Sequence, residues 1–231
     1  MTTTVAMGTM MIAFSNFSFF NWNQHTMESV NEASRISHAK ELLGKYYKGS
    51  YAQQLEGSRG LNVSIFNKVQ AQLQPKWKAQ AEKISKAIIT ESTKHEFDPI
   101  FVLAIIQTES QFNPLAIGSV GEIGLMQIRP ETAAWIAKKY GIAWNGPKTL
   151  KNPAMNVRIG VAYMTHLRNQ FEGASFKYVS AYNMGPKNVQ RMFSKKIQPK
   201  IYSTKVMNNY KDFYTSMAAQ NTDYKMAAYN M

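Results

Sequence analysis

The chain has 231 residues, 45% of them hydrophobic, no cysteine and a formal net charge of +13. This length supplies apolar side chains for one sizeable core, or for a core with a small accessory region. The lack of cysteine excludes disulfides, thiolate nucleophiles and cysteine metal ligands, whereas the positive charge favours polyanionic partners such as nucleic acid, anionic lipid or cell wall.

Residues 1–24 open the chain with an apolar, uncharged stretch that runs from Met1 to Phe20. The stretch is too short to cross a bilayer comfortably, so we expect no stable transmembrane span. Ala13 and Ser15 have the spacing of a signal-peptide cleavage site, although no Lys or Arg precedes the apolar stretch. We therefore interpret residues 1–24 as a candidate signal or targeting segment.

Residues 25–75 are polar and mixed, and they contain two helical patterns. The first is centred on Ile36 and Ala39 and can end at Gly44. The second precedes Pro75, which marks the expected boundary. We expect an accessory helical region here.

Residues 76–216 are expected to form the main domain, followed by a C-terminal tail over residues 217–231. Ala81, Ile84 and Ile88 recur at spacings of three and four, which predicts an amphipathic helix. Further helices are indicated over residues 130–140, 153–171 and 176–182. No hydrophobic alternation is long enough for a sheet, so the predicted fold class is mainly α.

A sharply bounded helix begins near residue 98. Asp98 is a good N-cap and Pro99 suits the first helical position. Residues 100–106 are apolar on every side of this helix, which is typical of a buried helix.

Glu109 closes that helix on the same face as Val102 and Ile105. A carboxyl group held against hydrocarbon resists ionisation, so its pKa rises and it can donate a proton near neutrality. The alternative is a surface glutamate at a fraying helix end, and the position alone leaves both open.

Four motifs follow one another in the chain: ESQFNP (109–114), GEIGLMQ (121–127), PETA (130–133) and AYNMGP (181–186). Their order resembles that of the soluble lytic transglycosylases, relatives of goose-type lysozyme in glycoside hydrolase family 23. The resemblance extends over about residues 84–210. It implies a lysozyme-like helical domain with a catalytic cleft, preceded by the accessory helical segment.

The resemblance also implies the roles of individual side chains. Glu109 matches the catalytic acid of the family, and the implied substrate-binding residues are Ser110, Gly124, Met126, Gln127, Tyr182, Asn183 and Tyr202. Two of these have a structural alternative, since Met126 can equally fill the core and Gly124 can be a turn glycine.

The sequence departs from the family pattern at several positions. Lys200 and Ile201 replace the usual Glu-Thr before Tyr202, and Met184 stands where alanine is common. Glu122 also replaces a common alanine, which puts a second carboxylate near the cleft.

The implied function is that of a peptidoglycan lytic transglycosylase. Glu109 would protonate the glycosidic oxygen between N-acetylmuramic acid and N-acetylglucosamine, and the muramoyl N-acetyl group would stabilise the cationic centre. Glu109 would then accept the proton of the 6-hydroxyl, which closes a 1,6-anhydro ring. The alternatives are a hydrolytic muramidase of the goose-lysozyme kind and a non-catalytic cell-wall-binding protein.

No metal or cofactor is expected, because the four histidines lack the paired spacing of a helical zinc site and no phosphate-binding glycine loop follows a strand. The absence of nucleic-acid-binding motifs argues against a nucleic-acid partner. We expect a monomer in the periplasm or cell envelope, or secreted, which acts on peptidoglycan glycan strands and has cell-envelope machinery as a candidate partner.

Overall fold

The computed structural model describes residues 29–229, and in this range the chain forms helices joined by loops, with no β-strand. The helices in chain order, with η marking 3₁₀ turns, are α1 (Glu32–Leu43), η1 (Gly44–Tyr47), α2 (Tyr51–Gln54), α3 (Leu61–Gln72), η2 (Pro75–Gln80), α4 (Ala81–Lys94), α5 (Pro99–Ser110), α6 (Pro130–Tyr140), η3 (Pro147–Lys151), α7 (Pro153–Gln170), α8 (Ser175–Met184), α9 (Pro186–Ser194) and α10 (Ile201–Tyr229). The predicted mainly α class is confirmed. The candidate targeting segment at residues 1–24 lies outside the described residues.

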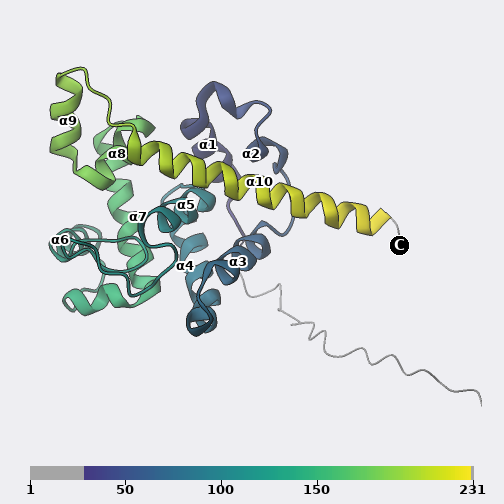
Figure 1. The fold of residues 1–231 in the computed structure, drawn as a ribbon, viewed down its shortest axis with the longest axis horizontal. Helices are drawn as coiled ribbons and strands as arrows, with labels where there is room; N and C mark the ends of the chain where they lie inside the picture. The colour runs from purple at the N-terminus through teal and green to yellow at the C-terminus, as the bar shows by residue number, and fades with distance from the viewer. Residues whose placement is uncertain (1–28, 230–231) are drawn as a thin grey trace, which may run out of the picture.

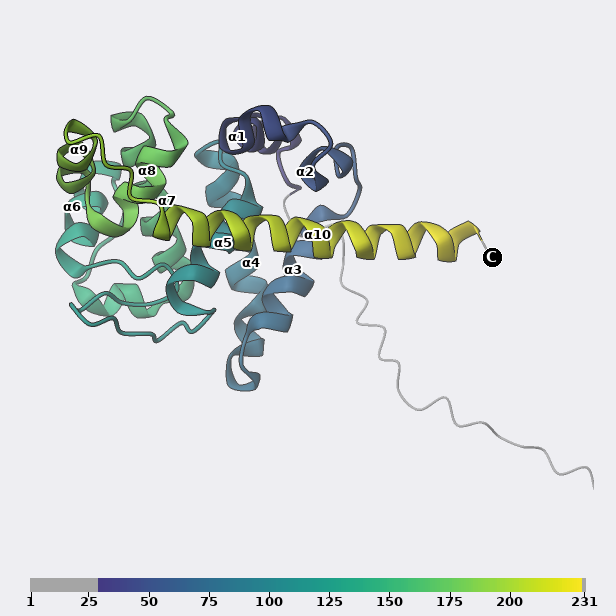
Figure 2. The same ribbon diagram turned by 45° about the horizontal axis from the view of Figure 1, so that its top comes forward.

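Helix α10 runs across the molecule in both ribbon views, with α1 and α2 on one side of it and α3 and α4 on the other (Figures 1 and 2). Helices α6 to α9 gather at the end where α10 begins. Helix α10 packs along α5, and α4 packs along α7. The core therefore lies around α5, which has neighbours on several sides.

Helix α5 is buried because nearly its whole first two turns are apolar. Residues 99–106 are all buried. The side chain of Asp98 accepts a hydrogen bond from the backbone N–H of Ile100 at 2.9 Å, which caps the helix as its sequence predicted. The helix ends where Gln111 adopts the left-handed conformation at φ 50°. This places Glu109 in the last turn of a rigid central helix.

The accessory region is joined to the main domain by a buried polar network. Arg35 of α1 is fully buried, and its guanidinium pairs with Glu32 at 2.6 Å and donates to the hydroxyl of Tyr214 at 2.8 Å. Tyr214 and Tyr210 of α10 donate to the Asp98 carboxylate at 2.7 and 2.6 Å. Buried charges need such partners, so the network holds α1, α10 and the start of α5 in one arrangement.

The accessory helices also share the apolar core of the main domain. Buried side chains on both sides of the boundary predicted at Pro75 belong to one cluster, among them Ile65 and Val69 before it and Ile84 and Ile88 after it. The first helix of the region ends at Gly44, as its sequence predicted. Because α3 packs on α4, the two regions are continuous in the core.

Helix α10 continues through residue 217, where the sequence predicted that a tail begins, and ends at Tyr229. No Gly or Pro follows Pro199, so nothing in the sequence interrupts a helix after that point. Met217 and Ala218 are buried, so at least this part of the predicted tail belongs to the core. In the part of the chain that the structure describes, no helix is both long and apolar enough to cross a membrane.

Candidate active site

Glu109 lies partly buried in the last turn of α5. The pKa of its carboxyl is raised to about 7, chiefly by burial and also by the nearby charge of Glu122. A hydrogen bond from Tyr202 and the charge of Lys205 act in the opposite direction. At neutral pH a substantial share of Glu109 therefore carries a proton, which is the state that a general acid needs.

Tyr202 of α10 lies directly against this acid. Its hydroxyl donates a hydrogen bond to Oε1 of Glu109 at 2.5 Å, across 93 residues of sequence. Burial and the neighbouring carboxylate both raise the pKa of Tyr202 well above its ordinary value, so the phenol stays protonated and remains a donor. The packing of α10 on α5 creates this contact.

A cavity of about 310 Å³ opens in front of Glu109. Its walls come from the loop between α5 and α6, from α6 and α7, and from the junction of α8 and α9. The lining residues are Glu109, Val120, Glu122, Gln127, Ile128, Arg129, Thr132, Tyr163, Tyr182, Asn183, Met184 and Gly185. The acid thus faces a polar hollow of a size that can hold a sugar unit.

The turn at Gly124 is organised by Asn156 of α7. The Asn156 side chain accepts a hydrogen bond from the N–H of Met126 at 2.8 Å and donates to the carbonyls of Ile123 and Leu150 at 2.8 and 3.0 Å. Gly124 has φ +84°, and a Cβ there would lie 2.2 Å from Nδ2 of Asn156. The positive φ and the lack of space for a Cβ both require glycine at this turn. This is the structural interpretation of Gly124 that the sequence left open.

Met126 is 1% exposed and is not among the residues that line the cavity. Its side chain lies over Gly160 of α7, where a Cβ would come within 2.4 Å of the Met126 sulfur. The hydroxyl of Tyr182 donates to the backbone carbonyl of Met126 at 2.9 Å. Met126 therefore fills the core beneath the cavity, and its backbone anchors Tyr182 in the wall.

Gln127 lines the cavity in a left-handed backbone conformation, φ 46°. Its Nε2 donates to the carbonyls of Ala116 and Gly124 at 3.1 and 2.9 Å. Residues other than glycine rarely adopt positive φ, and such positions cluster at binding sites. With both amide protons used within the loop, Gln127 has its side-chain oxygen available as an acceptor.

Ser110 and Asn183, two further predicted site residues, lie in different places. The Ser110 hydroxyl hydrogen-bonds to the backbone. Its oxygen lies 2.8 Å from the carbonyl oxygen of Leu125 and 3.2 Å from that of Ile106. It therefore ties the end of α5 to the loop that follows. Asn183 is exposed and lies in the cavity wall, next to Tyr182.

Sequence reasoning did not assign several residues of the site, and three of them have clear roles. Tyr163 of α7 lines the cavity, and its ring centroid lies 5.4 Å from that of Tyr182. Thr132 lines the wall from α6, and Asn156 supports the Gly124 turn. Thr132 had a usable signal, since it lies in the PETA motif (130–133), whereas the burial of Asn156 appears only in the structure.

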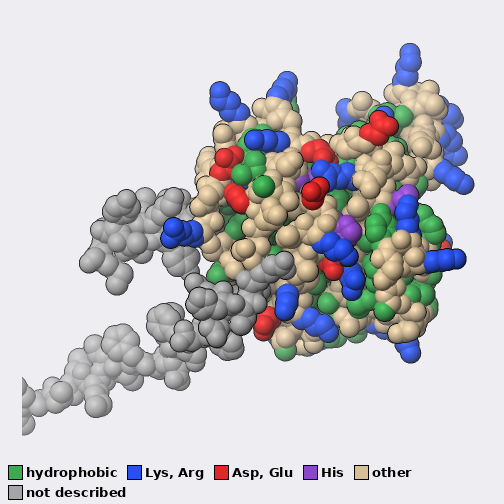
Figure 3. Space-filling view, turned by 180° about the vertical axis from the view of Figure 1, so that it is seen from behind, with side chains coloured by type: hydrophobic (Ala, Val, Ile, Leu, Met, Phe, Trp, Pro, Cys, Tyr) green, Lys and Arg blue, Asp and Glu red, His purple; other side chains and the backbone are tan. Residues whose placement is uncertain are grey.

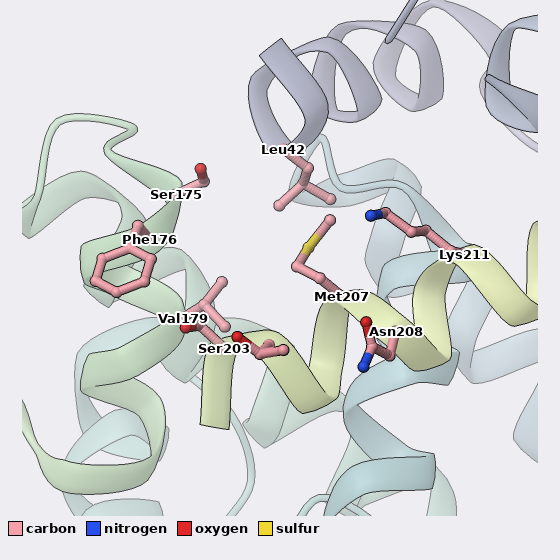
Figure 4. A pocket seen from close by; sticks show the side chains of 9 residues that line it. Leu42, Ser175, Phe176, Val179, Ser203, Met207, Asn208 and Lys211 are labelled. Atoms are coloured by element: carbon pink, nitrogen blue, oxygen red, sulfur yellow. The ribbon is translucent and has the colours of Figure 1, made fainter. Parts of the chain in front are cut away.

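The residues that the structure describes offer no metal site beside this cavity. No group of three or more His, Asp or Glu side chains there could hold a metal ion. Another cavity, of about 270 Å³, lies between α1, α8 and α10 (Figure 4). Its described lining includes Leu42, Phe176 and Met207 but no carboxyl group, so it offers no comparable proton donor.

Known proteins match this chain in sequence and in fold. The sequence profile described as the transglycosylase SLT domain matches residues 86–205. A membrane-bound lytic murein transglycosylase C from Histophilus somni (strain 2336) is 38% identical over 125 residues, which are 49% of this chain and 34% of that protein. A protein of the same name from Haemophilus influenzae (strain PittGG) is 35% identical over 137 residues, 55% of this chain and 38% of that protein. The chain thus spans about a third of the length of these relatives.

Solved structures share the fold. The 70 kDa soluble lytic transglycosylase SLT70 from Escherichia coli superimposes with a TM-score of 0.51 at 23% identity, over 80% of this chain and 35% of that one. An inactive mutant of the lytic transglycosylase Slt from Pseudomonas aeruginosa gives a TM-score of 0.51 at 18% identity, over 85% of this chain and 38% of that one. At these identities the likeness concerns the fold alone, and the predicted lysozyme-like helical domain is confirmed.

Proposed function

The chain belongs to the transglycosylase SLT domain family, and on this premise we propose that it is a lytic murein transglycosylase, which cuts the glycan strands of peptidoglycan. One observation carries the proposal. Glu109 has a pKa raised to about 7, faces a cavity of about 310 Å³, and accepts a hydrogen bond from Tyr202. A protonated carboxyl in a polar hollow has the chemistry of a general acid in glycoside cleavage.

The first step is proton transfer. Glu109 gives its proton to the oxygen that links N-acetylmuramic acid to N-acetylglucosamine, and the bond from the muramic C1 to that oxygen breaks. The N-acetyl group of the muramic sugar stabilises the positive charge that develops at C1. The Tyr202 hydroxyl, already 2.5 Å from Oε1, then stabilises the new carboxylate of Glu109.

The second step returns the proton. The carboxylate of Glu109 accepts the proton of the 6-hydroxyl of the same sugar, and the oxygen forms a bond to C1. This closes a 1,6-anhydro ring and regenerates the protonated acid without using water. Because the attacking hydroxyl belongs to the substrate, the protein needs no group to position a nucleophile.

The walls of the cavity would hold the sugars in place. We assign substrate contacts to the side-chain oxygen of Gln127 and to the exposed amide of Asn183, which lie in the lining with Glu109. Tyr182 and Tyr163 form an aromatic wall against which a sugar ring can pack. Ser110, Gly124 and Met126 contribute through the backbone that carries Gln127.

A hydrolytic muramidase remains a second candidate because Glu122 lines the same cavity. A second carboxylate could activate water, and its charge reaches Glu109 strongly enough to raise the pKa of that acid. Glu122 is already engaged, however, since its Oε2 accepts a hydrogen bond from the N–H of Val120 at 3.2 Å. This favours a structural role for Glu122 in the loop.

Mass spectrometry of the products from purified murein separates the two reactions. A transglycosylase releases fragments that end in 1,6-anhydromuramic acid, which are lighter by one water than the fragments from a hydrolase. Fragments with only reducing muramic ends would refute the transglycosylase mechanism and support the muramidase.

A Glu109→Gln variant tests whether the protein is catalytic at all. The amide keeps the shape of the side chain but cannot donate the proton, so we expect the rate of murein solubilisation to fall at least about 100-fold. The fold should tolerate the change, because the site already disfavours the charged form of Glu109. A matched Glu82→Gln variant, at an exposed position on α4, should keep full activity. Equal rates of solubilisation by the Glu109→Gln variant and the parent would disprove the assignment of Glu109 as the acid, whereas no solubilisation by the parent would support a wall-binding protein.

We further propose that the protein works at the cell envelope, where its substrate lies. Two relatives carry the description membrane-bound. Fractionation of cells followed by immunodetection tests this location, and recovery only in the cytoplasmic fraction would contradict it.

A further inference from the structure

Helix α9 and its flanks carry positive charge without any negative charge. Between Glu172 and Asp212 the sequence contains no Asp or Glu, but it contains eight cationic residues: Lys177, Lys187, Arg191, Lys195, Lys196, Lys200, Lys205 and Lys211. In the space-filling view, blue side chains project from the corner of the molecule that carries α9 (Figure 3). This region therefore differs from surfaces where charges of both signs alternate.

Lys187 and Arg191 share one side of α9, and Lys195 follows directly after the helix ends at Ser194. Lys187, Arg191 and Lys195 recur every four residues, and all three are exposed. We call this set the α9 basic face. Val189 lies between them in sequence and is buried, which fixes which side of the helix turns outward.

The chain itself does not neutralise the α9 basic face. None of the ion pairs formed by the residues that the structure describes includes Lys187, Arg191 or Lys195. Like charges four residues apart destabilise a helix. A bound anion would remove that repulsion, so the face is suited to a negatively charged ligand.

The α9 basic face begins at the rim of the cavity that contains Glu109. Asn183, Met184 and Gly185 line the cavity, and α9 starts at the next residue, Pro186. Lys187 follows at once. The cations of the α9 basic face therefore follow directly, along the chain, on residues that form the cavity wall.

We propose that the α9 basic face binds the carboxylates of the stem peptides, so that the preferred substrate is a glycan strand that still carries its stems. The proposal rests on the proposed function. The glycan backbone of such a strand is uncharged, because its muramic carboxyl groups are used in amide bonds to the stems, whereas the stems carry free carboxylates. Charge complementarity between the strand and α9 therefore arises from the peptides alone.

The test compares two substrates cut by the full chain: murein strands that carry stems, and the same strands after an amidase has removed the stems. A variant with Lys187→Gln, Arg191→Gln and Lys195→Gln removes three charges, and glutamine is a good helix former. The matched control carries Lys78→Gln, Lys83→Gln and Lys86→Gln at exposed positions on η2 and α4.

We expect the parent and the control to have a kcat/KM about fivefold higher on stem-bearing strands than on stem-free strands, as suits a few exposed ion pairs. The α9 variant should lose that preference and cut both substrates at the stem-free rate. Raising the salt concentration to about 0.5 M should reduce the preference of the parent, because screening shortens the range of such interactions.

Three results would overturn the proposal. The first is equal rates of the parent on both substrates, and the second is an equal loss in the α9 variant on both. The third is a loss that appears only in binding to vesicles of anionic phospholipid, which would assign the face and the neighbouring exposed Ile197 and Ile201 to a membrane surface. Failure to cut either substrate would contradict the proposed function itself, so the two proposals fail in distinguishable ways.

Discussion

Replacing Tyr202 with phenylalanine removes one hydroxyl and leaves the ring in place. That hydroxyl donates to Oε1 of Glu109 at 2.5 Å and lowers the pKa of Glu109 against the larger effect of burial. Without the donor, the ionised form of Glu109 loses a strong hydrogen bond, whereas the protonated form loses a weaker one. The pKa of Glu109 should therefore rise above about 7.

The size of the effect follows from the strength of the bond. A hydrogen bond to a charged group contributes about 1.5 to 3 kcal/mol, and 1.36 kcal/mol corresponds to about one pH unit in a titration. Water from the adjacent cavity can replace part of the lost bond. We therefore expect the titration of Glu109 to move upward by about one pH unit.

The assay is the pH dependence of kcat/KM for murein solubilisation. The reaction needs protonated Glu109, so activity falls as the pH rises through its pKa. The ratio of activity at pH 8 to activity at pH 6 should be about 0.1 in the parent and about 0.5 in the Tyr202→Phe variant. The maximum rate should fall, because the new carboxylate is less stabilised after proton transfer.

A Tyr46→Phe variant is the matched control, since Tyr46 is 70% exposed and does not line the cavity. Its pH profile should equal that of the parent. If the alkaline limb of the Tyr202→Phe variant stayed in place or moved to lower pH, Tyr202 would not be the donor that tunes Glu109.

Other substitutions test the surroundings of the site. Glu122→Gln removes a charge that raises the pKa of Glu109, so the alkaline limb of the same profile should move to lower pH, and an upward movement would contradict the assigned cause. Gly124→Ala places a Cβ 2.2 Å from a side-chain nitrogen at φ +84° and should lower the free energy of unfolding in urea by about 2 to 3 kcal/mol. Gly141→Ala, where φ is +63° but no atom lies within 4 Å, should cost about 1 kcal/mol in the same measurement, and equal losses would disprove the steric argument. Arg35→Met breaks a buried charged network and should cost about 3 kcal/mol by urea unfolding, whereas a neutral result would show that the network does not hold the accessory helices.

Local signals in the sequence were sufficient for most helices of the main domain. The helix predicted over residues 130–140 matches α6 from Pro130 to Tyr140. Asp98 caps α5, and Gly44 ends α1. These features depend on backbone hydrogen bonds, φ preferences and apolar periodicity within a few residues, so a single sequence contains the information that they need.

The identity of the candidate acid could also be read from the sequence, because Glu109 follows an apolar run and begins a recognisable motif. The roles of the residues around Glu109 were harder to infer from the sequence. Met126 and Gly124 each had two interpretations, and the choice depended on α7, which places Asn156 and Gly160 beneath the loop. Contacts between segments about 30 residues apart leave no pattern in either segment alone.

The sequence by itself determined most of the helices, the position of a carboxyl group at the end of the apolar one, and the surplus of positive charge. Only the tertiary structure decided that Tyr202 donates to that carboxyl, that Tyr163 joins the cavity wall, and that α10 continues into the predicted tail. The physical reason is that helix formation depends on neighbours in sequence. The direction of a side chain and the pKa of an acid depend on which distant helices pack around it.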